Sequence, residues 1–352
     1  MKKHRFLKSI FWFFAFCVVF ELVLRLFGYG NYTIYRPDDR LLWVPEPGRT
    51  LTVVNHLPIT INHQGFRYAS DLTQKQKDQL RIIAFGDSST QGWGVDDNSH
   101  YSAVLERTMN SGACPKEHAQ VVSAGVNAYP NSLIAEKVKL VVEDPVTRPD
   151  IAIVAYSYNS NFEKLPNLTG EARKAFLRRV EVKSIVRRSA IYNFVIEDLL
   201  RRVAYYQLRH IVMKGSLATI HDADVPDVNQ FDAGLQQSLD VCRRNGVQMM
   251  LLLLGSDGEM APEHPFQKAM LDFAQKNNVP IVNMIPVIST KDQSKMFMDP
   301  AHPTVAGHQI IANELLKAIR TLPVYQQDCE GTAPAVNVAN SSHSAAAATA
   351  TQ

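Results

Sequence analysis

Three residues of the chain have the types that nucleophilic catalysis by a serine requires. Ser88 directly follows Gly86 and Asp87 at the end of an apolar run, and Asp299 and His302 stand three residues apart far downstream. A serine hydroxyl is a poor nucleophile at neutral pH unless an imidazole accepts its proton, and the imidazole needs an acid that fixes its tautomer. We therefore predict acyl transfer with Ser88 as nucleophile, His302 as base and Asp299 as orienting acid.

Two other apolar runs also end in residues that can contact a ligand. Gly125 follows the second run, and a glycine lets a backbone N–H approach a ligand closely. Asn159 follows the third run and offers a side-chain amide donor. A Gly-Asp-Ser tripeptide alone is typical of an ordinary turn, so the prediction depends on the whole set of residues that follow the runs.

Other candidate residues are better explained by structural roles. Asp97 and His100 repeat the Asp-x-x-His spacing, but they lie at the start of a predicted helix, which favours N-capping. His308 falls inside the last predicted helix and is expected to pack there, while Trp93 is compatible both with a wall of an acyl pocket and with a brace for its loop. The sequence contains no HExxH motif and no Asp/Glu/His cluster with metal spacing, so we predict no metal and no cofactor.

Short apolar runs alternate along the chain with segments of helical periodicity. Each run is long enough for a strand buried on both faces and too short for a helix, so the alternation predicts a parallel sheet of about five strands with helices on both sides. Ligands of such sheets bind beyond the carboxyl ends of the strands, where the candidate residues stand. The predicted strands are 81–85, 120–124, 151–156, 249–254 and 279–285, and the predicted helices are 101–109, 132–142, 231–244, 266–276 and 305–319.

Taken together, these positions resemble the four conserved blocks of the SGNH (GDSL-type) hydrolase superfamily, over about residues 62–319. The segments 62–67 and 91–96 are also similar to those of bacterial members that carry an N-terminal membrane anchor. The resemblance implies a three-layer flavodoxin-like α/β fold and a serine hydrolase that acts on ester bonds. The matching positions are Gly86-Asp87-Ser88, Gly125, Asn159, and Asp299 with His302.

The resemblance also implies which groups hold the oxyanion of the tetrahedral intermediate. These donors are the backbone N–H groups of Ser88 and Gly125 and the side chain of Asn159. The third block departs from the family pattern, because Ser157 stands where the family usually has glycine and Ser160 where it usually has aspartate. Asn161 is therefore the alternative side-chain donor.

Residues 1–30 combine a basic beginning with an apolar segment, which predicts an uncleaved membrane anchor. The segment from 6 to 27 reaches the length of a spanning helix if Lys8 and Arg25 extend to the two interfaces, although Glu21 interrupts it. A cleaved signal peptide and a buried core helix are the alternatives. Positive charge on the short N-terminal side predicts a single-pass protein of the inner membrane with its catalytic domain in the periplasm.

The remaining segments are assigned from local composition. Residues 31–75 are predicted to form a lead-in β hairpin and linker, 76–325 the hydrolase domain and 326–352 a disordered tail that lacks apolar periodicity. The cysteines are far apart and form no CxxC pair, which excludes a zinc cluster and a dense disulfide framework. They are Cys17, Cys114, Cys242 and Cys329.

Charge is distributed unevenly along the chain. With 37 Lys and Arg against 34 Asp and Glu, the net charge of +3 gives no reason to expect a nucleic-acid partner. Residues 164–214, however, carry a net charge of +8, which leaves −5 for the rest of the chain. Apolar residues between the basic ones predict an amphipathic helical insertion over roughly 185–212. This basic segment either is a solvated face or contacts anionic lipid or an acidic polymer.

The leading interpretation is a membrane-anchored serine esterase that cleaves O-acyl esters of a carbohydrate, a lipid or a small ester. The first alternative is an SGNH-type O-acyltransferase that modifies an extracytoplasmic polysaccharide, in which a sugar hydroxyl replaces water as the acyl acceptor. The second alternative is a non-catalytic carbohydrate-binding protein on the same fold.

Overall fold

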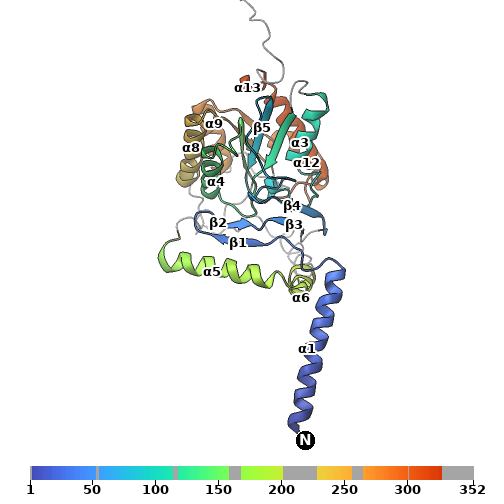
Figure 1. The fold of residues 1–352 in the computed structure, drawn as a ribbon. Helices are drawn as coiled ribbons and strands as arrows, with labels where there is room; N and C mark the ends of the chain where they lie inside the picture. Colours follow the sequence, from blue (N-terminus) through green and yellow to red (C-terminus); the bar gives the residue numbers. More distant parts are fainter. Residues whose placement is uncertain are drawn as a thin grey trace, which may run out of the picture.

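The computed structural model of the chain describes residues 2–52, 55–113, 118–157, 168–200, 228–255, 265–299 and 301–326. Figure 1 shows an α/β domain with a long N-terminal helix that extends from one end. Several predictions lie outside the described residues. These are the roles of Asn159 and Asn161, the cysteines at 114 and 329, the part of the insertion after residue 200, and all but the first residue of the predicted tail.

A five-stranded parallel sheet forms the centre of the domain, in the order β6-β5-β7-β8-β9. This is the flavodoxin-like order, as the resemblance implies. Almost every strand residue is buried, as expected for a sheet with both faces covered. The strands are β5 (Gln79–Phe85), β6 (His118–Ser123), β7 (Ile151–Tyr156), β8 (Gln248–Leu253) and β9 (Ile281–Asn283).

Alternate residues of the strands point into two separate apolar cores. In β5, Ile83 and Phe85 contribute to one core, whereas Ile82 and Ala84 contribute to the other. Figure 1 shows the helices on the two sides of the sheet. One side carries α4 (Asn131–Glu143), α8 (Val228–Arg244) and α9 (Pro265–Asn277), and the other carries α3 (Tyr101–Thr108) and α12 (Val305–Ile319).

The predicted strands and helices of this domain are confirmed to within a few residues. The last strand is four residues shorter than the predicted 279–285 and does not reach residue 285. It ends at Asn283 because the side chain of Asn283 accepts a hydrogen bond from the backbone of Ile285, where the short helix α10 (Ile285–Ser289) begins. Three further short elements complete this part of the chain: π-helical η1 (Met109–Ala113), α11 (Gln293–Met296) and α13 (Pro323–Tyr325).

The lead-in region forms two hairpins, so the prediction of a single hairpin was incomplete. β1 (Tyr35–Asp38) pairs with β2 (Leu42–Pro45), and β3 (Gly48–Leu51) pairs with β4 (Pro58–Ile61). The predicted hairpin was based on the alternation in 51–54 and 59–62, so it corresponds to the β3–β4 pair, although β3 ends where the first alternating segment begins. Sequence periodicity does not reveal the β1–β2 pair, because all four residues of β2 are buried and show no alternation. Nor is this region a separate linker, since Leu41 to Val44 belong to the same core as α4 and α8.

The β1–β2 hairpin covers the carboxyl ends of the central strands. Trp43 Nε1 donates to the backbone oxygen of Asn127, after β6, over 3.0 Å. The hydroxyl of Tyr35 donates to the side chain of Gln91, after β5, over 3.1 Å. Figure 1 shows the hairpin between the sheet and the helix α5 (Gly170–Val186), which lies across the end of the domain from which the N-terminal helix leaves.

The described part of the basic insertion, residues 168–200, is largely helical, but its elements differ from the predicted helix over 185–212. Helix α5 ends at Val186, and after a short break the chain continues as α6 (Ala190–Tyr192) and π-helical η4 (Asn193–Leu200). The break arises because Ser189 caps α6, its hydroxyl oxygen accepting from the backbone of Tyr192. The apolar periodicity of the sequence does not predict α5, because apolar residues lie on both sides of this helix. One side packs on the hairpin, and the other side is exposed.

The N-terminal helix α1 (Lys2–Leu26) contains a stretch from Phe6 to Leu26 that is long and apolar enough to cross a membrane. Of the residues in this stretch, only Leu24 is buried, which is inconsistent with a buried core helix. A membrane span and a signal sequence both fit a helix of this length and composition.

Candidate active site

The candidate nucleophile lies at a sharp strand-to-helix turn. Ser88 is the first residue of the one-turn helix α2 (Ser88–Gln91), which directly follows β5. Asp87 caps this helix by accepting a hydrogen bond from the backbone N–H of Ser89 over 2.9 Å. The turn ends at Gly92, whose φ of 82° is in the left-handed region that favours glycine. This geometry places the Ser88 hydroxyl at the carboxyl edge of the sheet.

The structure brings Ser88, His302 and Asp299 into one hydrogen-bonded line. The Oγ of Ser88 lies 2.8 Å from Nε2 of His302. The other ring nitrogen, Nδ1, lies 2.7 Å from Oδ2 and 2.8 Å from Oδ1 of Asp299. A proton on Nδ1 is thereby held by the carboxylate, which leaves Nε2 free to accept the proton of the serine.

Asp299 is held as a carboxylate. Burial alone would raise its pKa, but the hydrogen bond and charge of His302 and the backbone N–H groups of Ala301 and His302 outweigh burial and leave the pKa below its ordinary value. Those two N–H groups donate to Oδ1 over 3.0 and 2.9 Å. The same short loop therefore supplies both the acid and the groups that stabilise its charge.

A set of buried hydroxyl groups fastens the nucleophile turn to its neighbours. Ser157, after β7, donates a hydrogen bond to the carboxylate of Asp87. Ser89 donates to the backbone oxygen of Ala301 over 2.9 Å, which ties α2 to the loop of Asp299 and His302. Ser157 is one of the two residues that depart from the pattern that the resemblance implies, and here its hydroxyl orients the acid that caps α2. Sequence reasoning missed this role because the partners are 70 residues apart.

Gly125 lies against the nucleophile turn with no room for a side chain. A Cβ atom at this position would lie 2.3 Å from the backbone nitrogen of Gln91 and 2.8 Å from the backbone oxygen of Asp87. Its own N–H points to the hydroxyl of Ser123 at 3.4 Å, near the upper limit for a hydrogen bond. The structure thus brings Gly125 beside Ser88.

Buried Arg67 holds the loop that carries Trp93. Its guanidinium donates to the backbone oxygens of Gln91, Gly92 and Val95 over 2.7 to 2.8 Å. Burial lowers the pKa of Arg67 to about 10, so the side chain stays charged at neutral pH. The indole of Trp93 lies with its centroid 5.8 Å from that of the His302 ring. Trp93 therefore borders the imidazole of His302, a position that suits a wall of the candidate site.

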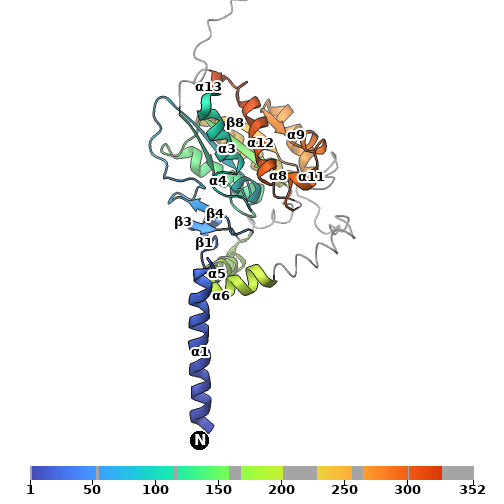
Figure 2. The same ribbon diagram turned by 90° about the vertical axis from the view of Figure 1, so that its right-hand side faces the viewer.

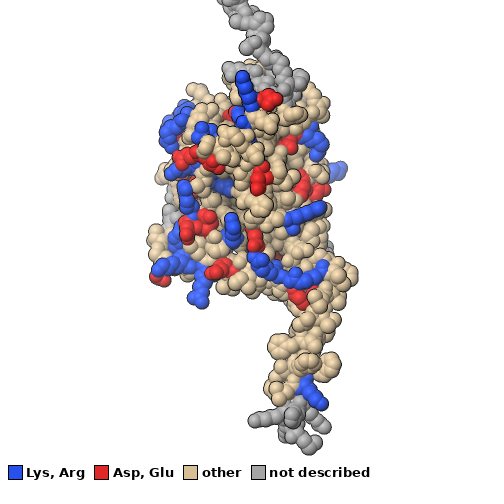
Figure 3. Space-filling model, viewed as in Figure 1, with Lys and Arg blue, Asp and Glu red and all other residues tan. Residues whose placement is uncertain are grey.

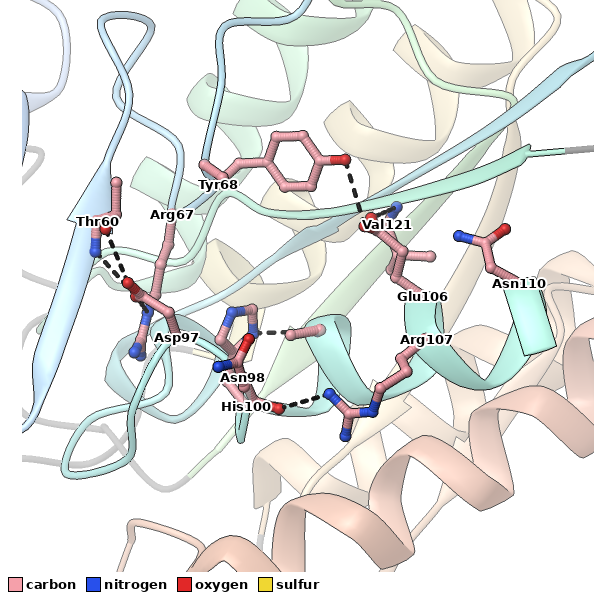
Figure 4. A pocket seen from close by; sticks show the side chains of 12 residues that line it. Thr60, Arg67, Tyr68, Asp97, Asn98, His100, Glu106, Arg107, Asn110 and Val121 are labelled. Atoms are coloured by element: carbon pink, nitrogen blue, oxygen red, sulfur yellow. Dashed lines mark hydrogen bonds and ion pairs between the residues drawn. The ribbon is translucent and has the colours of Figure 1, made fainter.

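The second Asp-x-x-His pair lies in a separate polar pocket, which Figure 4 shows. Asp97 accepts hydrogen bonds from the backbone and the hydroxyl of Thr60 over 2.9 and 2.7 Å and pairs with Arg67. His100 caps α3 through Ala103, so the capping role belongs to His100 rather than to Asp97. None of the three candidate catalytic residues lines this pocket.

Within the described ranges, no group of three or more His, Cys, Asp and Glu residues could hold a metal ion.

His308 is fully buried and forms no hydrogen bond with the three candidate catalytic residues among the described contacts. Its Nδ1 accepts a hydrogen bond from the backbone of Tyr101 over 3.3 Å, and among the described residues nothing pairs with its Nε2. Burial lowers the pKa of His308 to about 3, and the charges of Arg67 and His302 act in the same direction. The side chain is therefore a neutral packing element of the core.

The depressed pKa of His308 predicts acid sensitivity of the fold. The folded state keeps this ring neutral between pH 6.5 and about 3, whereas the unfolded chain protonates it, so stability is present above pH 6.5 and is lost as the pH falls. We expect the variant His308→Asn to flatten the pH dependence of the unfolding free energy by about 1.4 kcal/mol per pH unit between about pH 6 and pH 4.

Urea unfolding of the detergent-solubilised chain at several pH values measures this slope. The exposed His63 supplies the control, and His63→Asn is expected to keep the slope of the unaltered chain. An equal slope in His308→Asn would show that His308 takes up its proton in the folded state.

Comparison with known proteins supplies the family. Residues 84–310 match the GDSL-like Lipase/Acylhydrolase family, a span that includes all three candidate catalytic residues. No curated protein matches the chain in sequence.

Solved structures with a similar arrangement include three bacterial enzymes. Each alignment covers 68% of this chain. They are a psychrotrophic esterase from Pseudoalteromonas sp. (11% identity, 96% of that chain, TM-score 0.42), a lipase/acylhydrolase from Enterococcus faecalis (12%, 95%, 0.41) and an acetylxylan esterase from Geobacillus stearothermophilus, solved as a catalytic mutant (14%, 93%, 0.41).

The family match covers more than half of the chain and agrees with the strand order and with the residues that meet at the carboxyl edge of the sheet. The chain therefore belongs to the GDSL-like lipase/acylhydrolase family and is a hydrolase of ester bonds.

Proposed function

We propose that the chain is a membrane-anchored serine esterase that cleaves O-acyl esters through an acyl-enzyme on Ser88. The observation that carries the proposal is the line of contacts from Ser88 Oγ to His302 Nε2 and from His302 Nδ1 to Asp299. A serine, an imidazole and a carboxylate in this order can activate the hydroxyl for attack on a carbonyl carbon.

The reaction proceeds in two steps. Ser88 Oγ attacks the carbonyl carbon of the ester while its proton passes to His302 Nε2, and Asp299 stabilises the imidazolium that forms. The protonated imidazole then gives this proton to the leaving alkoxide, so that the alcohol departs and the acyl group remains on Ser88. Water then attacks the acyl-enzyme while His302 takes its proton. His302 returns this proton to Ser88 Oγ as the bond between Oγ and the acyl carbon breaks, and the free acid leaves.

The oxyanion needs fixed donors on the side of the carbonyl opposite to His302. The backbone N–H of Ser88, at the start of α2, and the N–H of Gly125, packed against the same turn, are the proposed backbone donors. The side chain of Asn159, or of Asn161 in its place, is the proposed third donor.

The proposal also includes the location of the enzyme and the class of ester that it cleaves. The apolar stretch Phe6–Leu26 supports a single-pass anchor in the inner membrane, and the basic residues before it support a periplasmic position of the catalytic domain. The acyl ester is one carried by a carbohydrate, a lipid or a small alcohol. The basic segment 164–214 is the proposed contact with an anionic neighbour of the enzyme.

Labelling with a fluorophosphonate probe tests the nucleophile. We expect the probe to modify Ser88 in the full chain. The variant Ser88→Ala should not be labelled, and its rate of aryl acetate hydrolysis should fall by about 10⁴-fold or more. Ser294→Ala, which removes an exposed hydroxyl, is the control and should keep both. Labelling that persists in Ser88→Ala and maps to another serine would refute the assignment.

Two asparagine variants identify the third oxyanion donor. Losing one donor is expected to lower kcat by about 10² to 10³-fold, because the transition state alone carries the full oxyanion charge. We expect Asn159→Ala to show this loss and Asn161→Ala to stay within a few fold of the unaltered chain. The reverse pattern would assign the role to Asn161, and an unchanged kcat in both variants would contradict a side-chain donor at either position.

The identity of the acyl acceptor separates hydrolysis from O-acyl transfer. In an O-acyltransferase, a polysaccharide hydroxyl takes the place of water at the acyl-enzyme. We expect aryl acetate turnover to release acetate at the same rate with and without added oligosaccharide, measured by chromatography of both products. Acetylated oligosaccharide as the main product would replace the esterase proposal by the transferase, and an inert protein with unmodified Ser88 would favour the non-catalytic carbohydrate-binding alternative.

A further inference from the structure

Outside α1, the large apolar side chains that are exposed in the described part of the chain gather on one segment. Six of the eight lie on α5 and η4, and the exceptions are Phe27, which directly follows α1, and Val305 on α12. Single exposed apolar residues are ordinary, but a group of them on one segment marks an interaction surface. The six are Val182, Ile185 and Val186 on α5 and Ile196, Leu199 and Leu200 on η4, with exposed fractions between 37 and 61%.

Helix α5 presents its three exposed apolar side chains away from the domain. Its inner side packs on the first hairpin, where Phe176 lies 5.8 Å from Trp43 between ring centroids and Arg173 donates to the backbone oxygen of Asp39. At 3.6 residues per turn, Val182 and Ile185 fall on the opposite side of the helix from these contacts. The outward side of α5 is therefore apolar in part although nothing in the described chain covers it.

Basic side chains accompany the apolar ones on the same face. An open groove of about 640 Å³ runs along α5 beside Tyr192, and four cations and two valines line most of it: Lys174, Arg178, Arg179 and Lys183 with Val182 and Val186. Figure 3 shows Lys and Arg side chains along this end of the domain. A helix with mixed apolar and basic side chains is typical of the headgroup region of an anionic bilayer.

The segment is fastened to the point at which α1 meets the domain. The carboxylate of Glu21 accepts hydrogen bonds from the backbone N–H groups of Ala190 and Ile191 over 2.8 and 2.9 Å and from the hydroxyl of Ser189 over 3.0 Å. Arg25 donates to the backbone oxygen of Arg188 over 2.6 Å. Glu21, which interrupts the apolar segment in the sequence, thus caps α6.

Further contacts extend this junction to η4. The rings of Phe20 and Phe194 lie 6.1 Å apart between centroids, and the hydroxyl of Tyr29 donates to Asp198 over 2.5 Å. Figures 1 and 2 both show α5 across the end of the domain from which α1 extends. If α1 spans a bilayer, residues 20–29 mark the depth at which the chain leaves it, and α5 to η4 lies at that depth.

We propose that the segment 170–200, from α5 to η4, is a platform that lies on the headgroups of anionic phospholipids. The apolar side chains enter the boundary between headgroups and acyl chains, and the cations of the groove pair with lipid phosphates. The proposal rests on the membrane anchoring of α1 under the proposed function. Since the platform supports the hairpin that covers the carboxyl ends of the strands, it sets the orientation of the Ser88 site relative to the bilayer.

Photocrosslinking of the full chain in vesicles tests the platform. p-Benzoylphenylalanine is placed at one position at a time, in place of Val182, of Ile185, of Phe13 in α1, or of the exposed Lys268 on α9. The vesicles contain phosphatidylcholine with or without phosphatidylglycerol. We expect lipid adducts at positions 182 and 185 in the anionic vesicles, adducts at position 13 in both kinds of vesicle, and none at position 268.

Removal of the basic charge tests the recognition of anionic lipid. Exchange of Lys174, Arg178, Arg179 and Lys183 for Gln is expected to lower the adduct yield at position 185 by at least about tenfold, because each cation near an anionic surface contributes to binding. The matched variant exchanges four exposed cations of α8 and α9 for Gln and should keep the yield: Arg243, Arg244, Lys268 and Lys276. Aryl acetate hydrolysis by both variants should stay unchanged, which shows that the domain is folded.

The pattern of lipid adducts at positions 13, 182 and 185 distinguishes failure of the platform from failure of the anchor. Adducts at position 13 without adducts at 182 and 185 would overturn the platform while leaving the anchor in place. Absence of adducts at position 13 would overturn the anchor and the platform with it. A third outcome would also overturn the platform. If neither position 182 nor position 185 forms lipid adducts, and added dextran sulfate shields both positions from modification by a water-soluble reagent, the face binds a soluble polyanion instead of lipid.

Discussion

The hydrogen bond between Ser88 and His302 joins two segments that are 214 residues apart, and the parallel sheet is what allows them to meet. All five strands end at one edge, so residues that follow different strands converge there although the chain separates them widely. The bond also requires close packing, because Gly125 has no space for a side chain against the turn of Ser88. Substitutions that move this turn would therefore break the contact between Ser88 Oγ and His302 Nε2.

Much of this arrangement could be predicted from the sequence, because local patterns determine it. Buried strands of a parallel sheet are continuous apolar runs, and the candidate catalytic residues stand directly after such runs or next to the last helix. Features that depend on distant partners could not be predicted. The bond from Ser157 to Asp87, the three carbonyl oxygens held by Arg67 and the β1–β2 hairpin, whose second strand shows no alternation, belong to this kind.

The N-terminal region shows how an apparent defect in a sequence can be a contact in the structure. Glu21 interrupts the apolar segment and argues against a membrane span when the sequence is considered alone. In the structure its carboxylate satisfies backbone N–H groups at the start of α6, as an acidic group at a helix N-terminus commonly does. A contiguous set of contacts therefore runs from α1 through α5 and the first hairpin to the loops after β5 and β6.

The central claim is that Ser88 and His302 act as one unit, and a comparison of kcat among three variants tests it most directly. The account predicts that Ser88→Ala and His302→Ala each lose activity severely and that the double variant loses no more than either alone, since neither residue is effective without the other. Losses that multiply in the double variant would show that the two side chains act independently, and this result would contradict the account.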